Sequence, residues 1–536
     1  MKRFIKNIIP AAILTLAFGM TSCTGDLDVT PIDPNLSLDV DYDGLFNKCY
    51  ANLGLQGNGG ANGDCDIDGL DGGTTGFIRQ MWNSNELTTD EAICSWGDDG
   101  IQQFDYNSYD ASHPMMNGYF NRLTTGISYC NQYLQVAADQ DAQKIAEIRF
   151  IRALHYYLLM DAFGNVPFAE TLSTPSYMTR SEIYSWLESE LLEIEPSLAA
   201  ARAKTSNDSM YGRADKAAAW MLLMRLYFNA EVYTGTAQWG KAAEYAKKVM
   251  DSSYKLNTEG TANWSAYQML FMGDNGESSA ANECIFPVLC DGKKTTSWGV
   301  SLFLMASTYD TDMDATPADA GGNNGTSEKW AGNRARYDLI HKFFPSDNAP
   351  TDVQGYDMKT AAGDDRALFF SKGHTLKNEL GYFGDFKDGY GVAKFINYKS
   401  TGAVVKGSDA QFPDADFFLF RVAEAYLTYA EATARQNGDM TTSEGTELIN
   451  ALRKRANAET KTVYTLEQIL DEWSREFYFE GRRRVDLIRH GKFGGSSYKW
   501  MWKGGAKEGR SFDSHLNIFA IPADQVKGAI LQNPGY

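Results

Sequence analysis

Histidine and closely spaced cysteine are scarce in this chain, and their scarcity bears on metal chemistry. Only 6 of the 536 residues are histidine, and no two of the 7 cysteines stand at a Cys-x-x-Cys spacing. A structural zinc site needs about four such ligands at close spacing. The sequence therefore predicts no zinc centre.

Positive charge is also in short supply. Lys and Arg number 50 against 69 Asp and Glu, which leaves a formal net charge of −19. Nucleic-acid binding requires basic patches that neutralise phosphates. We therefore predict that the chain has no nucleic-acid partner.

The familiar catalytic motifs are missing as well. The chain contains no Gly-x-Ser-x-Gly, no His-Glu-x-x-His, no Walker loop and no dinucleotide-binding fingerprint. A glycosidase needs two carboxylates across a cleft, and among 69 acidic residues spacing alone neither identifies nor excludes such a pair. We interpret the chain as a protein that is not an enzyme.

The N-terminus has the features of an export signal. Lys2, Arg3 and Lys6 precede an apolar run that is too short to span a bilayer, so residues 1–22 are predicted to be a signal peptide. Met-Thr-Ser-Cys at its end resembles a bacterial lipobox, which makes Cys23 the expected lipidation site; an ordinary signal peptide with an incidental cysteine is the alternative. Residues 23–40 are polar and punctuated by proline, as in a tether.

Six further cysteines follow the lipobox. An exported chain can form disulfides, but one of this size does not require them, so buried free thiols are expected and pairing is left open. These cysteines are Cys49, Cys65, Cys94, Cys130, Cys284 and Cys290.

Helical periodicity dominates two regions, residues 115–252 and 419–490. Within them, small and aromatic residues alternate as in tetratricopeptide repeats, where small residues let paired helices approach. The predicted fold is therefore mainly α, a tetratricopeptide-like helical scaffold within a single domain at residues 41–536. The expected helices are Asp41–Leu55, Tyr119–Ala137, Ala142–Phe163, Ser181–Ala203, Ala214–Tyr233, Trp239–Met250, Ala423–Asn437, Glu444–Asn457 and Arg475–His490.

Residues 253–418 have a different composition. Gly, Asp, Asn, Thr and Ser dominate, and apolar runs are short. We predict a large loop-rich insertion that recognises a ligand while the helices position it. The chain also contains 29 Tyr, 29 Phe and 11 Trp, more than a helical scaffold needs, so some aromatic side chains are expected to face a ligand.

The segment Arg475–His490 is unusually rich in opposite charges on an apolar helix face. Arginine and carboxylate pair bidentately in fixed geometry, so these residues predict a partly buried network that joins helix to helix. Gly481 in its middle costs roughly 1 kcal/mol against alanine and indicates close approach of another backbone.

This segment also carries a resemblance. Arg-Glu-Phe-Tyr-Phe-Glu-Gly-Arg-Arg-Arg-Val-Asp-Leu, the block Leu419–Ala432 and the tail from Ile521 to Tyr536 resemble the SusD/RagB family of outer-membrane glycan-binding lipoproteins. The resemblance runs from the leader to the last residue. It implies a lipid-anchored protein of the outer cell surface that captures oligosaccharides and works as a lid on a SusC-like TonB-dependent transporter.

The resemblance also implies a binding site. Trp96 and Trp330 fall where the starch-binding member of the family has tryptophans in an aromatic arc, and Phe303 falls where it has a tyrosine. Arg79 and Asp99 match positions that donate or accept hydrogen bonds there, although Asp99 replaces an amide. Each ring removes about 50 Å² of apolar sugar surface from water, roughly 1 kcal/mol, so several rings are needed for useful affinity.

Other residues are lower-ranked candidates for the binding site. The candidates for polar contacts with a glycan are Arg366, Tyr398 and Asp68. For Arg366 the alternative is a structural ion pair with Asp364 or a neighbouring carboxylate. A structural calcium ion at Asp274, Asn275 and Glu277 is a further hypothesis, although their spacing is not that of an EF-hand and no cofactor is required. Three further aromatic candidates are Trp82, Trp298 and Tyr309.

The ligand expected from the arc is an α-glucan such as starch. The first alternative is a fructan such as levan, for which the polar contacts would matter more. The second is a non-glycan nutrient, with the protein acting only as a partner of the transporter.

Overall fold

Packed helices make up most of the part of the chain that the computed structural model describes, namely residues 40–137, 141–314, 323–379, 381, 384–403 and 405–536. Residues 43–536 form one compact unit. The predicted signal peptide at 1–22, Cys23 and the tether up to residue 39 lie outside the described residues. Of the described helices, none has the length and apolar character needed to cross a membrane.

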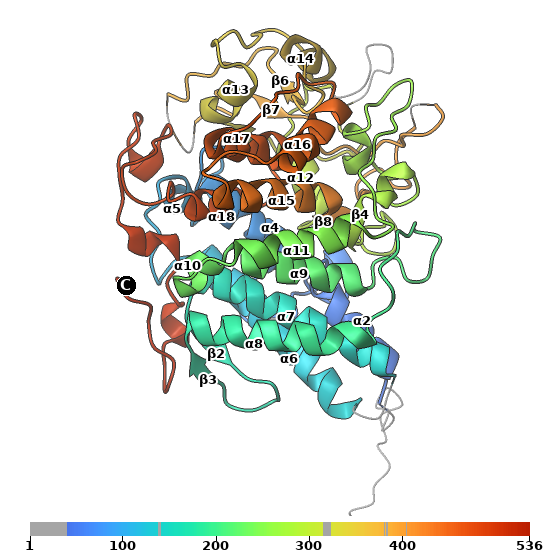
Figure 1. Cartoon of the computed structure of the whole chain (residues 1–536), viewed down its shortest axis with the longest axis vertical. Helices are drawn as coiled ribbons and strands as arrows, with labels where there is room; N and C mark the ends of the chain where they lie inside the picture. The colour runs from blue at the N-terminus through green and yellow to red at the C-terminus, as the bar shows by residue number, and fades with distance from the viewer. Residues whose placement is uncertain (1–39, 138–140, 315–322, 380, 382–383, 404) are drawn as a thin grey trace, which may run out of the picture. The chain divides into compact units, whose positions relative to one another are not determined.

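The first helical region is a stack in which each long helix packs against the next. α6 packs on α7, α7 on α8, and α9 on α11 (Figure 1). Several of these helices begin after a residue whose side chain caps the first turn. Asp215 is an example, since its carboxylate accepts hydrogen bonds from two backbone amides of α9. The helices are α6 (Pro114–Val136), α7 (Ala142–Phe163), α8 (Arg180–Ile194), α9 (Lys216–Phe228), α10 (Ala230–Thr234) and α11 (Trp239–Met250).

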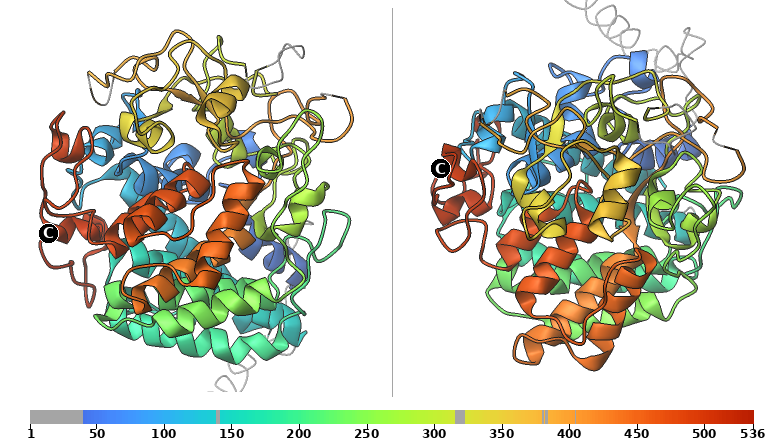
Figure 2. Two further views of the ribbon diagram at one scale, coloured as in Figure 1. Left: turned by 45° about the horizontal axis from the view of Figure 1, so that its top comes forward. Right: turned by 90° about the horizontal axis from the view of Figure 1, so that it is seen from above.

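The second helical region continues the stack. α11 packs on α15, although the insertion separates them in sequence, and α15 packs on α16 and α17 (Figures 1 and 2). The prediction of a mainly α, tetratricopeptide-like scaffold is confirmed. The helices are α15 (Val422–Gln436), α16 (Ser443–Arg455), α17 (Leu466–Phe477) and α18 (Arg483–Arg489).

Several helix boundaries differ from the prediction; for example, α6 begins at Pro114 rather than Tyr119, and α2 ends at Ala51 rather than Leu55. The expected helix from Ser181 begins one residue earlier, because Thr179 and Glu182 form a capping box, and it ends at Ile194 before a 3₁₀ turn that contains a proline. The expected helix over 214–233 divides at Asn229 into α9 and α10.

The predicted single helix Arg475–His490 is wrong in its middle. α17 ends at Phe477, and Phe479 and Gly481 have φ angles of 62° and 76°, which turn the chain before α18. The break lets Gly481 approach α4, where its Cα would place an added Cβ 3.5 Å from the Cα of Trp82. The predicted close approach of another backbone at Gly481 is therefore confirmed.

The described residues of region 253–418 form only short elements, as predicted. Its later segments, with α13, α14, β6 and β7, lie beyond α17 at the end of the helix stack, and its first segments, with β4, lie along one side of the stack (Figure 1). β4 (Cys284–Val288) pairs antiparallel with β8 (Phe417–Arg421), and β8 leads directly into α15. The other elements are α12 (Ser301–Ala306), β5 (Asn333–Ala335), α13 (Tyr337–Phe343), α14 (Gly355–Ala362), β6 (Phe369–Phe370) and β7 (Gly391–Val392).

Shorter elements complete the fold. β1 pairs antiparallel with β5, and β2 with β3. The remaining helices and strands are α2 (Tyr42–Ala51), α3 (Gly72–Thr75), α4 (Phe77–Trp82), the π-helix Asn83–Leu87, β1 (Ala92–Cys94), α5 (Ile101–Asp105), β2 (Val166–Phe168) and β3 (Ser176–Met178). The 3₁₀ turns are Gly60–Asn62, Glu195–Ser197, Gln268–Phe271, Ser279–Asn282, Lys503–Gly505, Ser514–Asn517 and Ala523–Gln525.

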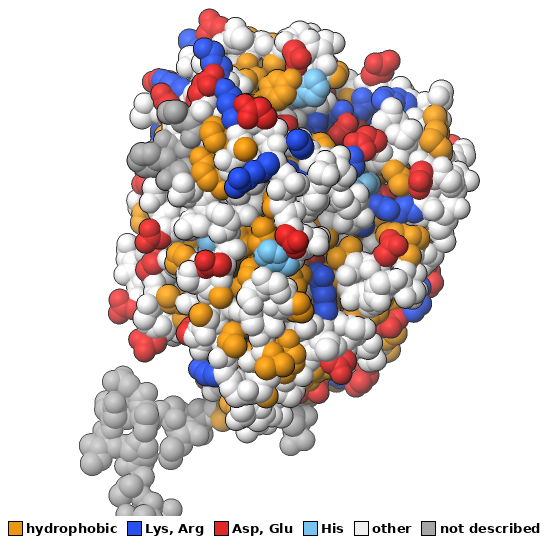
Figure 3. Space-filling view, turned by 90° about the vertical axis from the view of Figure 1, so that its left-hand side faces the viewer, with side chains coloured by type: hydrophobic (Ala, Val, Ile, Leu, Met, Phe, Trp, Pro, Cys, Tyr) orange, Lys and Arg blue, Asp and Glu red, His pale blue; other side chains and the backbone are white. Residues whose placement is uncertain are grey.

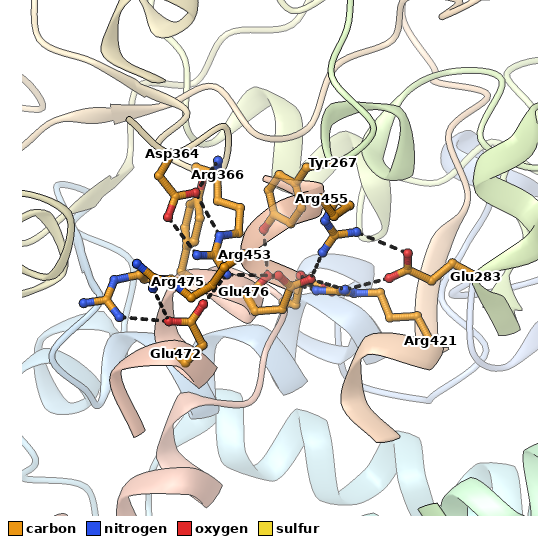
Figure 4. A network of polar contacts seen from close by, with 12 residues as sticks. Tyr267, Glu283, Asp364, Arg366, Arg421, Arg453, Arg455, Glu472, Arg475 and Glu476 are labelled. Carbon is orange, nitrogen blue, oxygen red and sulfur yellow. Dashed lines mark hydrogen bonds and ion pairs between the residues drawn. The ribbon is translucent and has the colours of Figure 1, made fainter. Parts of the chain in front are cut away.

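Buried ion pairs hold the insertion to the scaffold around α17 (Figure 4). Glu476 accepts from Arg421 at 2.7 Å and from Arg366 at 3.3 Å, and it also pairs with Arg455. All four side chains are almost fully buried, and they come from α17, β8, the insertion and α16. The predicted helix-to-helix network is therefore confirmed.

A second carboxylate extends this network. Glu472 accepts from Arg366 and from Arg453, both at 2.7 Å. Burial raises the pKa of both glutamates, but the surrounding guanidinium groups outweigh it and lower the pKa of Glu472 and of Glu476 to about 2. Both are therefore charged at neutral pH, and the network is structural.

Charged side chains of both signs lie on one lateral face of the molecule. In Figure 3, acidic and basic side chains are intermingled with apolar ones across the face nearest the C-terminal segments. Mixed charge of this kind is typical of a solvated protein surface.

Candidate functional site

Three half-buried tryptophans form a row on the loops around α12. The ring centroids of Trp298 and Trp330 are 6.2 Å apart, and those of Trp330 and Trp96 are 6.3 Å apart. Adjacent rings are tilted by 41° and 54°, so the three rings do not share one plane. We call Trp298, Trp330 and Trp96 the tryptophan row.

Backbone pairing places Trp96 beside Trp330. The antiparallel strands β1 and β5 bring their flanking loops together, and the amide of Ser95 donates to the carbonyl of Gly332 at 3.0 Å. The indole N–H of Trp96 donates to the carbonyl of Trp330 at 3.0 Å. The spacing of these two rings is therefore set by strand register.

The end of α12 supports the loop that carries Trp330. The amide of Trp330 donates to the carbonyl of Ala306 at 2.7 Å, and the amide of Gly332 donates to that of Ser307 at 2.8 Å. The indole N–H of Trp330 donates to Glu328 at 2.9 Å. Glu328 in turn accepts from Gln411 at 2.9 Å, which holds the ring in one orientation.

A small apolar cluster lies beneath the other end of the row. Leu302, Ala306 and Phe412 are buried, and Trp298 and Trp330 pack against them. The indole N–H of Trp298 donates to the carbonyl of Ala61 at 2.8 Å, which joins its loop to the Gly-rich loop at 57–71. A ring fixed at one face and on its N–H leaves its other surface for a ligand.

Gly332 is required for the position of Trp96. A Cβ added at Gly332 would lie 2.1 Å from Cε2 of the indole, closer than any real contact. The ring therefore lies directly on the backbone of the Trp330 loop. This contact explains why a glycine follows the Trp-Ala pair.

Arg79 supplies hydrogen-bond donors at the Trp96 end. Its guanidinium carbon lies 5.7 Å from the Trp96 ring centroid, and its Nη2 pairs with Asp98 at 3.1 Å. Its Nε is buried and has no hydrogen-bond partner within the described part of the chain. Arg79 is thus a planar polar group beside an aromatic ring, as predicted for its position, and its contact with a glycan stays a prediction.

The structure corrects the aromatic predictions. Phe303 is fully buried, edge-on to Trp82 at 5.5 Å, because α12 turns its side chain into the core. Trp298, ranked lower from the sequence, takes the third place in the row instead. Trp82 and Tyr309 are also core residues, with 1% and 0% exposure.

The polar predictions separate into two groups. Arg366 is wrong as a glycan contact, because it is fully buried and its guanidinium pairs with Asp364, Glu472 and Glu476. Tyr398 is wrong as well: it is 3% exposed and stacks on Trp264. Asp68 and Asp99 are exposed, Asp68 on the loop that contacts Trp298 and Asp99 on the loop that carries Trp96.

The proposed calcium ligands do not converge. The carboxylate of Asp274 accepts from the amide and hydroxyl of Ser400 and from Thr401. Asn275 is bonded to backbone groups, and the exposed Glu277 faces Lys399 at 3.7 Å. Across the described residues there is no group of three His, Cys, Asp or Glu side chains that could hold a metal ion.

Comparisons with known proteins agree with this architecture. The model of the SusD family matches residues 259–536, and a second model, described as starch-binding and associating with the outer membrane, matches residues 74–221. The chain is 40% identical over 574 aligned positions to the starch-binding protein SusD of Bacteroides thetaiotaomicron, covering 100% of this chain and 99% of that protein.

Solved structures share the fold at lower identity. A laminarin-binding SusD-like protein superposes with a TM-score of 0.64 at 20% identity, covering 93% of this chain and 99% of that one. Surface glycan-binding protein A from Bacteroides uniformis gives a TM-score of 0.65 at 19% identity, covering 92% and 98%.

The chain belongs to the SusD family. The resemblance predicted from its C-terminal blocks is confirmed, and so is the prediction that it is not an enzyme, because SusD-like proteins are non-catalytic glycan-binding proteins. The second family model, by its description, associates the chain with the outer membrane.

Proposed function

We propose that this protein binds an α-glucan along the tryptophan row at the cell surface and delivers it to a SusC-like TonB-dependent transporter. The observation that supports the proposal is the row itself, three tilted indoles fixed by backbone hydrogen bonds on neighbouring loops. A helical α-glucan is curved, so its consecutive glucose rings change orientation and can meet indoles that are tilted relative to one another. The full-length relative named as a starch-binding protein supports the same ligand class.

The strength of binding follows from the number of rings. Each indole removes apolar sugar surface worth roughly 1 kcal/mol, and Arg79 adds hydrogen bonds worth about 1 kcal/mol each. The sum, about 4–5 kcal/mol, corresponds to a Kd of about 10⁻³ to 10⁻⁴ M. Weak binding suits a protein that must release its cargo to a transporter.

A fructan remains the alternative within the same role. It depended on polar contacts from Asp68, Arg366 and Tyr398, and of these only Asp68 is exposed. The geometry therefore supports the α-glucan over levan. A protein that served only as the transporter's partner for a non-glycan nutrient would not need a tryptophan row. The row therefore does not support that alternative.

Membrane attachment belongs to the same proposal. Acyl chains on Cys23 would anchor the protein, since each buried CH₂ contributes about 0.8 kcal/mol and stable anchoring takes two or more chains. The tether would then place residues 43–536 at the surface. Cys23→Ser should release the protein into the soluble envelope fraction if the lipid is its anchor.

The test is affinity electrophoresis and calorimetry with amylopectin and levan in parallel. We expect retardation by amylopectin and about a tenfold weaker affinity in Trp330→Ala, because the middle ring contacts both neighbours. Trp186→Ala is the matched control, since Trp186 is also half-buried and donates its indole N–H to a carboxylate. Retardation by levan alone would overturn the ligand assignment, and binding to neither would favour the non-glycan role.

A further inference from the structure

Two buried thiols from different helices meet outside the tryptophan row. Cys49 lies on α2 and Cys130 on α6, and both are 0% exposed. Burial and the adjacent Cys49 thiol raise the pKa of the Cys130 thiol. Neither residue takes part in the proposed glycan site.

Neighbouring contacts show that the two helices are in register around this pair. One turn before Cys49, Phe46 meets Tyr133, one turn after Cys130, with ring centroids 5.8 Å apart. On the other side, the side-chain amide of Asn52 donates to the carbonyl of Arg122 at 3.3 Å. The contacts therefore run antiparallel along α2 and α6, with the thiols between them.

A glycine on α6 keeps the two segments close at this point. A Cβ added at Gly126 would lie 2.2 Å from Nε2 of His155 on α7 and 2.5 Å from Nδ2 of Asn52, so a side chain at this position would displace both. A disulfide needs Cβ atoms about 3.8 Å apart, which is reached only where two backbones come close. The thiols stand one helical turn from that point of approach.

We propose that Cys49 and Cys130 form a disulfide in the exported protein. Each thiol loses its hydrogen, the two sulfurs bond, and two electrons and two protons pass to a disulfide acceptor, which becomes two thiols. The acceptor is a small-molecule or protein disulfide of the cell envelope. The inference rests on the proposed export, because such bonds persist in oxidising compartments.

Two other described cysteines have different neighbours. The thiol of Cys65 contacts the hydroxyl of Thr75 at 3.3 Å, and that of Cys290 contacts the hydroxyl of Ser301 at 3.6 Å. The bridge would close a loop of about 80 residues and tie α2, the first helix of residues 43–536, to the scaffold. Its expected effect is greater resistance of this end of the fold to unfolding.

Peptide mapping tests the proposal. The full chain, isolated from the envelope of the producing cells, is alkylated in denaturant without reductant and digested with trypsin. Cleavage after Lys48 and Arg122 gives peptides 49–79 and 123–144, which we expect to be linked and to separate on reduction. Peptide 49–79 also contains Cys65, so Cys65→Ser is the matched control that must keep the link, while Cys49→Ser must lose it.

Two further measurements separate geometry from export. Reduction should lower the Tm of the wild-type protein by about 4 °C and leave the Tm of Cys49→Ser unchanged. A second sample is denatured, reduced and refolded with oxidised glutathione. If glutathione forms the link but the isolated chain lacks it, the proposed export fails; if both samples carry alkylated, unlinked Cys49 and Cys130, the disulfide is refuted.

Discussion

Glu476 offers the sharpest test of how the scaffold holds the insertion. Glu476→Gln keeps the shape of the side chain but removes the charge that faces Arg366, Arg421 and Arg455. All of these groups are buried, and breaking a buried ion pair costs about 3–5 kcal/mol because the partners are left uncompensated. Since Arg366 and Arg421 keep other carboxylates, we expect a loss near the lower end, about 3 kcal/mol.

The assay is urea unfolding followed by circular dichroism, comparing Cm at unchanged m. The control is Glu467→Gln, which removes a partner of Lys492 at a surface where Glu467 is 61% exposed and should cost less than about 1 kcal/mol. Equal shifts in the two variants would refute the reasoning, because they would mean that burial does not strengthen the dependence on Glu476.

The difference in stability between the wild-type protein and Glu476→Gln should depend on pH. The folded pKa of Glu476 is about 2, below its ordinary value near 4.5, so its ionised form contributes stability above about pH 4.5. This contribution is lost as pH falls from about 4.5 towards 2. The difference in Cm between wild type and Glu476→Gln should therefore shrink on acidification, and a constant difference would contradict the assignment.

Three further predictions concern the site. Trp298→Ala should weaken glucan binding by about tenfold and cost less stability than Phe303→Ala, which should cost about 3–5 kcal/mol because Phe303 is core; calorimetry and urea unfolding separate the two. Gly332→Ala should displace the Trp96 ring and reduce affinity while far-UV circular dichroism stays unchanged. Tyr398→Phe should leave glycan binding unchanged, because the side chain is only 3% exposed, and lost levan retardation in this variant would contradict the structure.

Much of the fold could be predicted because helical periodicity is a local property. α7 (Ala142–Phe163) and α11 (Trp239–Met250) occupy the predicted ranges, since their apolar residues recur every turn. The ends of α7 are also marked, by the capping side chain of Asp141 and by Gly164. The break at Phe479 could not be predicted, because it depends on the approach of Gly481 to α4, about 400 residues earlier in the chain.

The site was predictable only in part. Trp96 and Trp330 stood out because small or polar residues surround them in loops. Trp298 and Phe303 were ranked in the wrong order because α12 begins at Ser301 and turns Phe303 inward. The glycine after Trp298 was the available signal, since it favours a loop over a helix.

Arg366 shows that sequence patterns do not reveal contacts between distant parts of the chain. Its neighbour Asp364 indicated an ion pair, but its partners on α17 are more than a hundred positions away in the sequence. No local pattern reveals such a contact, so a buried arginine and an exposed one look alike in the sequence.

A crystal structure of the protein with a bound malto-oligosaccharide would test the central proposal most directly. We expect successive glucose rings to lie against Trp298, Trp330 and Trp96, with Arg79 donating to a sugar hydroxyl at the Trp96 end. An oligosaccharide bound elsewhere, with the tryptophan row bare, would contradict the account.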